Sequence, residues 1–76
     1  MKDLLETLVQ GLVQEPAQVR VTEWMEDGVL FLDLEVAAPD RGRVIGRRGS
    51  TAEALRVVLD AVGRRRGTPC DLEILD

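Results

Sequence analysis

The chain has 76 residues, of which 45% are hydrophobic and 32% are charged, and its formal net charge at pH 7 is −4. A chain of this length forms one small domain that buries only roughly 60% of its unfolded surface, which excludes a second domain or a large enclosed active site. Because there is no histidine and only one cysteine, a disulfide framework, a zinc-ligand cluster and most acid–base or nucleophilic catalysts lack their parts. We therefore expect no catalytic residues, no metal and no cofactor.

The first predicted element is a helix over about residues 3–14. Asp3 and Glu6 have the spacing of a capping box, and apolar residues then recur with helical spacing until Pro16 stops the pattern. From Val19 the period changes to two, and Asp27-Gly28 is typical of a hairpin turn. We therefore predict an antiparallel hairpin with strands at about residues 18–25 and 29–37.

A very short helix is predicted next. Pro39 ends the second strand, and Asp40 can cap a helix that runs through Val44 and Ile45. The segment Gly46-Arg47-Arg48-Gly49 then breaks this helix.

The last two predicted elements are a long helix and a strand. Ser50 and Glu53 have the spacing of a second capping box, which opens a helix that ends at about Gly63. Alternating apolar residues then predict a closing strand over 70–74, parallel to its neighbour if the crossover has the usual form. The fold class is therefore α+β, in the order α-β-β-α-α-β, with a three-stranded sheet and three helices packed on one face.

Charge is distributed unevenly along the chain. Residues 41–66 carry eight arginines against two carboxylates, a net charge of +6, whereas the other fifty residues carry a net charge of −10. An acidic protein repels nucleic acid and anionic membranes on average. The basic segment is nevertheless the place where we expect function.

The glycine loop within this segment is suited to binding phosphate. Glycine at positions 46 and 49 lets the backbone turn tightly and leaves no Cβ to obstruct a ligand. The following helix directs its free N–H groups and its positive dipole end into the loop, and Arg47 and Arg48 add two cations. An ordinary helix–helix turn is the alternative interpretation.

These residues resemble a known family. Val44-Ile45-Gly46-Arg47-Arg48-Gly49, followed by Ala52 and Leu55, is similar to the VIGxxG signature of KH domains, whose GxxG loop clamps a backbone of about four nucleotides. The extra helix and strand before the core resemble the type II bacterial variety. Over residues 1–76 the chain resembles the small bacterial single-KH proteins of the KhpA family, which implies one KH domain with its GxxG loop at 46–49.

The resemblance implies a non-catalytic, sequence-tolerant protein that binds single-stranded RNA and acts as an RNA chaperone. It also implies a larger partner of the Jag or KhpB type, which joins a KH domain to a second nucleic-acid-binding domain, and a link to cell-wall homeostasis and cell length. Two positions depart from the family pattern, since Thr51 replaces a large aliphatic residue and Glu53 replaces a lysine. The predicted RNA-binding residues are Arg43, Val44, Ile45, Gly46, Arg47, Arg48, Gly49, Ser50, Ala52 and Leu55.

The other arginines allow two interpretations. Arg41, like Arg43, either flanks the RNA path or serves solubility. The run Arg64-Arg65-Arg66 complements the negative dipole end of the long helix, and contact with RNA is the alternative.

Residues outside the basic segment say little about RNA. Trp24 and Phe31 are the only aromatic residues and cannot form a multi-base stacking platform, so base recognition is expected to be aliphatic and backbone-based. Cys70 is expected to be a buried small hydrophobe.

The longest apolar run is four residues, Val29 to Leu32, far short of a membrane span or a signal-peptide core. We expect a soluble, cytoplasmic protein.

The long helix carries apolar residues over an arc of roughly 200°, about twice what packing on one sheet requires. We therefore predict an oligomer or partner interface near Val57, Asp60, Ala61 and Arg64. The protein would form a homodimer, a heterodimer with the larger partner, or both. The second hypothesis is an interaction module whose partner carries most of the RNA affinity.

Overall fold

The computed structural model describes residues 1–76, and its element order confirms the predicted fold class. Three single 3₁₀ turns, at Pro16–Gln18, Ala38–Asp40 and Arg47–Gly49, connect the main elements. The helices and strands are α1 (Lys2–Gln10), β1 (Arg20–Glu26), β2 (Val29–Glu35), α2 (Arg41–Ile45), α3 (Ser50–Arg66) and β3 (Cys70–Ile74).

The three strands form one sheet in the order β1-β2-β3. β1 and β2 are antiparallel and join through Asp27 and Gly28, whose φ angles of 51° and 79° are the positive values that a tight hairpin turn requires. β3 pairs with β2 in parallel, as predicted, because the helical crossover returns the chain to the same end of the sheet.

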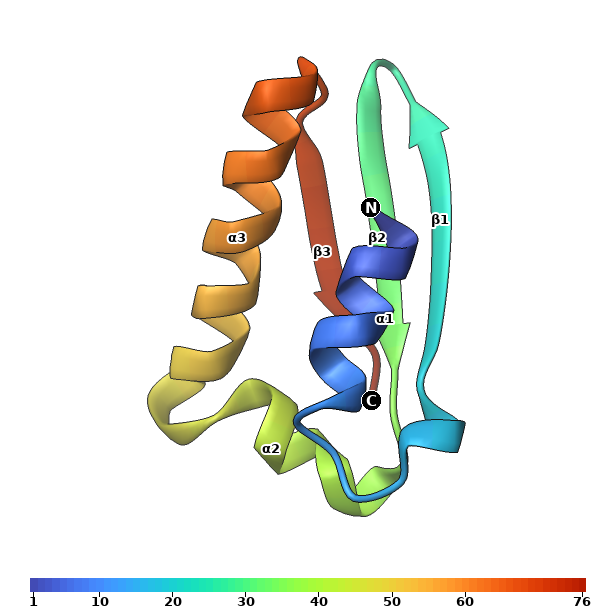
Figure 1. Ribbon diagram of the computed structural model, residues 1–76, viewed down its shortest axis with the longest axis vertical. Coiled ribbons are helices and arrows are strands. Elements are labelled where there is room, and N and C mark those ends of the chain that lie inside the picture. Colours follow the sequence, from blue (N-terminus) through green and yellow to red (C-terminus); the bar gives the residue numbers. More distant parts are fainter.

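The helices cover one face of the sheet. In Figure 1, α1 lies across the front of the sheet and α3 runs alongside β3, while the short α2 lies at the base and leads into α3. Buried residues of α1, α3 and the strands form a single apolar core, in which Leu5, Leu32, Leu34 and Leu59 are at most 1% exposed. The opposite face of the sheet is not covered, because none of the strand residues that point to it is buried. No helix is both long enough and apolar enough to cross a membrane.

The first helix ends at Gln10, earlier than predicted, and a distant carboxylate holds the segment that follows it. The N–H groups of Gln14 and Glu15 donate to the two oxygens of Asp40, each at 3.1 Å. An amide used in this way cannot donate to the carbonyl four residues earlier. Asp40 is 1% exposed, and although it precedes α2 its side chain makes no capping hydrogen bond there, which corrects the predicted cap.

Both predicted capping boxes are wrong. Asp3 lies inside α1, which begins one residue earlier, and Ser50 is the first residue of α3, so neither side chain is free to cap. The N-cap of α3 is Gly49, in a left-handed conformation.

The long helix also ends later than predicted. Gly63 lies within α3, where a Cβ would collide with the Thr68 carbonyl oxygen. The left-handed residue that ends the helix is Gly67, at φ 70°. Glycine at position 63 therefore allows the returning chain to approach closely. The strands are also shorter than predicted, since residues 18–19 and 36–37 lie outside them.

The buried carboxylate gives a stability prediction. Asp40→Ala leaves two amides without an acceptor, and we expect the free energy of unfolding to fall by about 3 kcal/mol. Asp40→Asn keeps one side-chain oxygen and should lose about half as much. Urea denaturation measures both, with Asp76→Ala as the exposed control. If Asp40→Ala is as stable as the control, these two hydrogen bonds do not hold the fold.

Candidate nucleic-acid interface

The glycine loop is a single tight turn between α2 and α3. The N–H of Gly46 donates to the Gly42 carbonyl at 2.8 Å, and the N–H of Gly49 donates to the Gly46 carbonyl at 3.1 Å. Arg48 and Gly49 have φ angles of 56° and 75°, the left-handed region that side chains disfavour. The chain then enters α3 directly, so the loop lies at the amino end of the longest helix.

Position 46 requires glycine, because its backbone has a positive φ and a neighbouring side chain leaves no room for a Cβ. Its φ is 77°, and a Cβ there would lie 2.7 Å from Cβ of Thr51, closer than real side chains pack. Thr51, one of the two departures from the family pattern, is half-buried against the underside of the loop. Gly49 has open space around it, so only its backbone conformation favours glycine.

The tip of the loop is positively charged. Arg47 and Arg48 are exposed and form no ion pair in the structure. The first backbone N–H groups of a helix have no partner within the helix, so those of α3 add further donors beside the two guanidinium groups. Arg43 lies one turn before the loop, with its Nε 3.7 Å from Oδ1 of Asp40, so its charge is partly balanced.

A groove runs beside the loop, between the helices and β3. Its volume is about 420 Å³, which lies within the roughly 300–1,000 Å³ of small-molecule sites. The apolar side chains along it are suited to holding a base. Its lining residues are Ile45, Gly49, Ala52, Arg56, Asp71, Leu72, Glu73 and Ile74.

The structure brings some of the predicted RNA-binding residues to this groove and others to the core. Ile45, Gly49 and Ala52 line the groove. Val44 is fully buried and Leu55 is 5% exposed, so these two side chains support the helices from within. Arg43, Arg47, Arg48 and Ser50 are exposed around the loop, and Gly46 is half-buried at its base.

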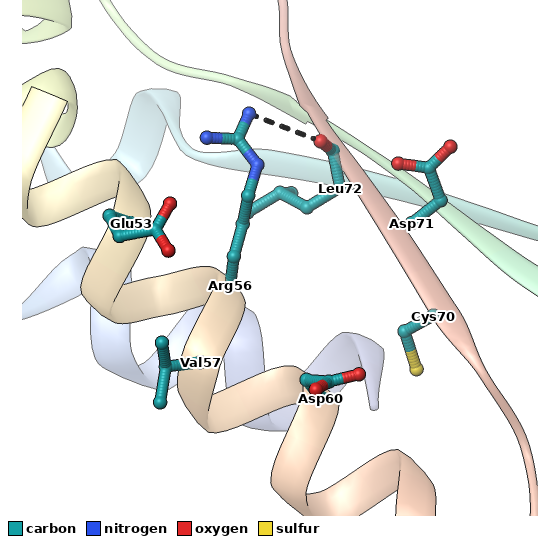
Figure 2. Close-up of a pocket in the computed structure, with 7 residues that line it drawn as sticks. All are labelled: Glu53, Arg56, Val57, Asp60, Cys70, Asp71 and Leu72. Atoms are coloured by element: carbon teal, nitrogen blue, oxygen red, sulfur yellow. Dashed lines mark hydrogen bonds between the residues drawn. The ribbon is translucent and has the colours of Figure 1, made fainter.

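Arg56 is a groove residue that the sequence interpretation missed. Its side chain extends from α3 to β3, where Nη2 donates to the Leu72 carbonyl at 3.3 Å (Figure 2). Since a guanidinium carries five N–H groups, most of its donors remain available to a ligand. Arg56 follows Ala52 by four residues, which places both on one face of the helix, and this spacing is the signal that could have found it.

Beyond Arg56 the groove continues into a smaller, acidic hollow. Carboxylates of Glu53, Asp60 and Asp71 line it, together with Val57 and other residues (Figure 2). These carboxylates repel phosphate. A polyanion is therefore favoured at the loop end of the groove and disfavoured at this end.

Cys70 also lines the acidic hollow and is therefore less buried than predicted, although it packs against the core. Its thiol is half-buried and donates to the Thr68 carbonyl at 3.6 Å. Burial raises the pKa of the Cys70 thiol, which keeps it protonated and unreactive at neutral pH.

The residues of the predicted partner interface lie on the exposed side of α3. Val57 is 58% exposed, and Asp60 and Arg64 form an ion pair at 2.9 Å. A separate apolar hollow lies between α1 and α3, lined by Leu8, Leu12, Thr51, Ala54, Leu55 and Val58. The apolar surplus of α3 is therefore exposed in the single chain.

Comparison with known proteins identifies the family. A profile described as the KH domain of KhpA/KhpB matches residues 2–74. The chain belongs to the KhpA/KhpB KH-domain family. It is 40% identical to the RNA-binding protein KhpA of Halalkalibacterium halodurans, over 100% of both chains. It is also 40% identical to KhpA of Aquifex aeolicus, over 100% of this chain and 96% of the relative, and 36% identical to KhpA of Chlamydia pneumoniae, over 100% and 97%.

Solved structures share the KH fold. A variant of Era from Aquifex aeolicus, bound to GDP and aluminium fluoride, aligns with 96% of this chain at a TM-score of 0.63 and 16% identity. Era in complex with MgGDPNP and nucleotides 1506–1542 of 16S ribosomal RNA aligns with 96% of this chain at a TM-score of 0.57 and 18% identity. In each case the match covers 28% of the Era chain, so the likeness concerns the fold of one part of Era.

The loop of this KH domain gives a second stability prediction. We expect Gly46→Ala to lower the free energy of unfolding by about 2 kcal/mol or more, because alanine disfavours a positive φ and its Cβ meets Thr51. Gly42→Ala is the matched control, since Gly42 is helical and nothing lies within 4 Å of the position that an added methyl group would take there. The control should gain about 0.5–1 kcal/mol. Equal effects of the two substitutions in urea denaturation would contradict this account of the loop.

Proposed function

We propose that this protein binds single-stranded RNA without catalysing a reaction. The observation that supports this best is the glycine loop, where two positive-φ glycines, two unpaired arginines and the amino end of α3 converge beside an apolar groove. Phosphate oxygens fit the loop, because backbone N–H groups and guanidinium groups donate to them there. The family, whose relatives are called RNA-binding proteins, supports the same proposal.

The groove beside the loop would hold the bases. Ile45, which is 39% exposed, offers apolar surface on the helix side, and the half-buried Ile74 offers it on β3. Ala52 and Leu72 are buried beneath them. Arg56 would donate from its free N–H groups to acceptor atoms on the base edges. The carboxylates of Asp71 and Glu73 line the strand side and would keep the phosphate backbone on the loop side by repulsion.

This arrangement favours weak, sequence-tolerant binding. The chain offers only two arginines at the tip of one loop and has no exposed row of aromatic residues for stacking. Such binding suits an RNA chaperone that acts in the cytoplasm with a larger KH-containing partner of the Jag/KhpB type. The proposed link of this pair to cell-wall homeostasis and cell-length control rests on the resemblance to the family.

Binding of short single-stranded RNA across a salt series tests the proposal. The slope of log K against log salt should be about −3, because about four phosphates each contribute roughly −0.7. We expect the double variant Arg47→Asp with Arg48→Asp to abolish binding and leave the unfolding transition unchanged, since both side chains are exposed. Fluorescence anisotropy of a labelled oligonucleotide measures the affinity.

The matched control is Arg65→Asp with Arg66→Asp, which makes the same charge change at the far end of α3 and outside the proposed interface. It should weaken binding far less than the loop variant does. If the two double variants bind equally well, the loop is not the phosphate site.

A second candidate function is assembly of a protein complex in which the partner carries most of the RNA affinity. It is favoured by the exposed apolar surface of α3, where Val57 is 58% and Val58 41% exposed. Large exposed aliphatic side chains on one helix are typical of interaction surfaces. The interface would include Val57, Asp60, Ala61 and Arg64, in a homodimer, a heterodimer with the Jag/KhpB-type protein, or both.

Sedimentation tests this interface. Ala61→Asp places a charge among apolar contacts, and we expect it to weaken self-association by about tenfold or more. Ala17→Asp adds the same charge at an exposed alanine outside α3 and should leave the assembly state unchanged. The interface is wrong if Ala61→Asp sediments like the native chain. RNA binding by the complex but not by the isolated chain would favour the second function over the first.

A further inference from the structure

The uncovered face of the sheet has a distinct composition. Trp24 of β1 lies opposite Phe31 of β2, which lies beside Asp71 of β3. Successive side chains of a strand point to opposite faces, and Figure 2 shows Asp71 and Leu72 on opposite sides of β3. Leu72 is buried under the helices, so the row that contains Trp24 faces away from them. The open sheet face comprises Arg20, Thr22, Trp24, Glu26, Val29, Phe31, Asp33, Glu35, Asp71 and Glu73.

The two aromatic residues of the chain are stacked on this face. The ring centroids of Trp24 and Phe31 are 5.6 Å apart and the ring planes are inclined by 15°. Trp24 nevertheless remains 40% exposed, because no element of this chain covers it. A partly exposed tryptophan on a rigid sheet is the kind of residue that dominates binding energy in protein interfaces.

Carboxylates surround the aromatic pair and are not neutralised. The open sheet face carries five of them against the single Arg20, and none of the five takes part in an ion pair of the chain. Asp33 and Glu73 lie directly opposite each other across β2 and β3. Like charges in this position destabilise a sheet. A bound cation would therefore remove a repulsion that the isolated chain keeps.

We propose that the open sheet face binds an arginine-rich segment of a protein partner. A guanidinium group stacks on an indole face by cation–π attraction and donates paired hydrogen bonds to a carboxylate, so it fits both features at once. Lysine fits less well because its ammonium is a compact, strongly hydrated charge. The same carboxylates repel RNA. Asp71 and Glu73 of β3 also line the groove beside the glycine loop, so the two surfaces border each other along this strand. The centre of the site lies outside the groove, because Trp24, Phe31 and Asp33 line none of the three hollows described above. The proposal therefore does not rest on the RNA function.

The fluorescence of Trp24, the only tryptophan, tests the proposal directly. Titration with nona-arginine should change the emission saturably, and nona-lysine should bind at least about fivefold more weakly. Asp33→Asn with Glu73→Gln should weaken nona-arginine binding about tenfold while leaving the fold intact, because it removes a like-charge pair. The matched control is Asp3→Asn with Glu15→Gln, which removes the same charge outside the sheet and should weaken binding far less.

Two further variants test whether the peptide binds at the open sheet face or elsewhere on the molecule. Trp24→Leu, followed by calorimetry, should lose several-fold in affinity for nona-arginine if stacking contributes. Arg47→Asp with Arg48→Asp should bind the peptide as the native chain does, whatever its effect on RNA. The proposal is overturned if nona-lysine binds as tightly as nona-arginine, if both carboxylate variants weaken binding equally, or if the loop variant abolishes peptide binding.

Discussion

The position of the glycine loop depends on the buried carboxylate of Asp40. α2 has only five residues, and a helix of this length is not stable through its own hydrogen bonds. Asp40 accepts the amides of Gln14 and Glu15 and so ties the start of α2 to the segment that follows α1. Val44, which is fully buried, fixes the helix in the core. The loop that follows therefore has a fixed place relative to β3, and the groove has two fixed walls.

The burial of Asp40 also affects the distribution of charge on the surface of the protein. Asp40 is buried and lies near Arg43, so it adds no exposed negative charge beside the loop. The unpaired arginines lie at the tip of the loop, whereas the unpaired carboxylates of the open sheet face lie along the strands. The net charge of −4 is therefore a poor guide to binding, because attraction over a few ångströms depends on local charge. An acidic chain offers a basic site where its arginines are unpaired.

Much of the fold and of the site could be predicted because the signals are local. Asp27-Gly28 specifies the hairpin, and Gly46 marks the end of α2 and the start of the loop. Contacts between distant segments account for most of what was missed. The path of the chain after α1 depends on Asp40, which lies 25 residues or more further along the chain than the amides it accepts, and the role of Arg56 depends on β3. Val44 shows that a sequence pattern alone does not distinguish a groove wall from the core behind it.

The register of β3 is what separates the two proposed binding surfaces. Leu72 and Ile74 point toward the helices, whereas Asp71 and Glu73 belong to the open sheet face and reach the groove only from the strand side. A shift of one residue would exchange these two sets, because the side chains of a strand alternate. The tight return from α3 prevents such a shift, since the N–H of Thr68 donates to the Gly63 carbonyl at 2.8 Å. One strand of five residues can therefore present apolar side chains to the RNA groove and carboxylates to the open sheet face. The two proposed ligands would meet along this strand, where Asp71 and Glu73 border both surfaces.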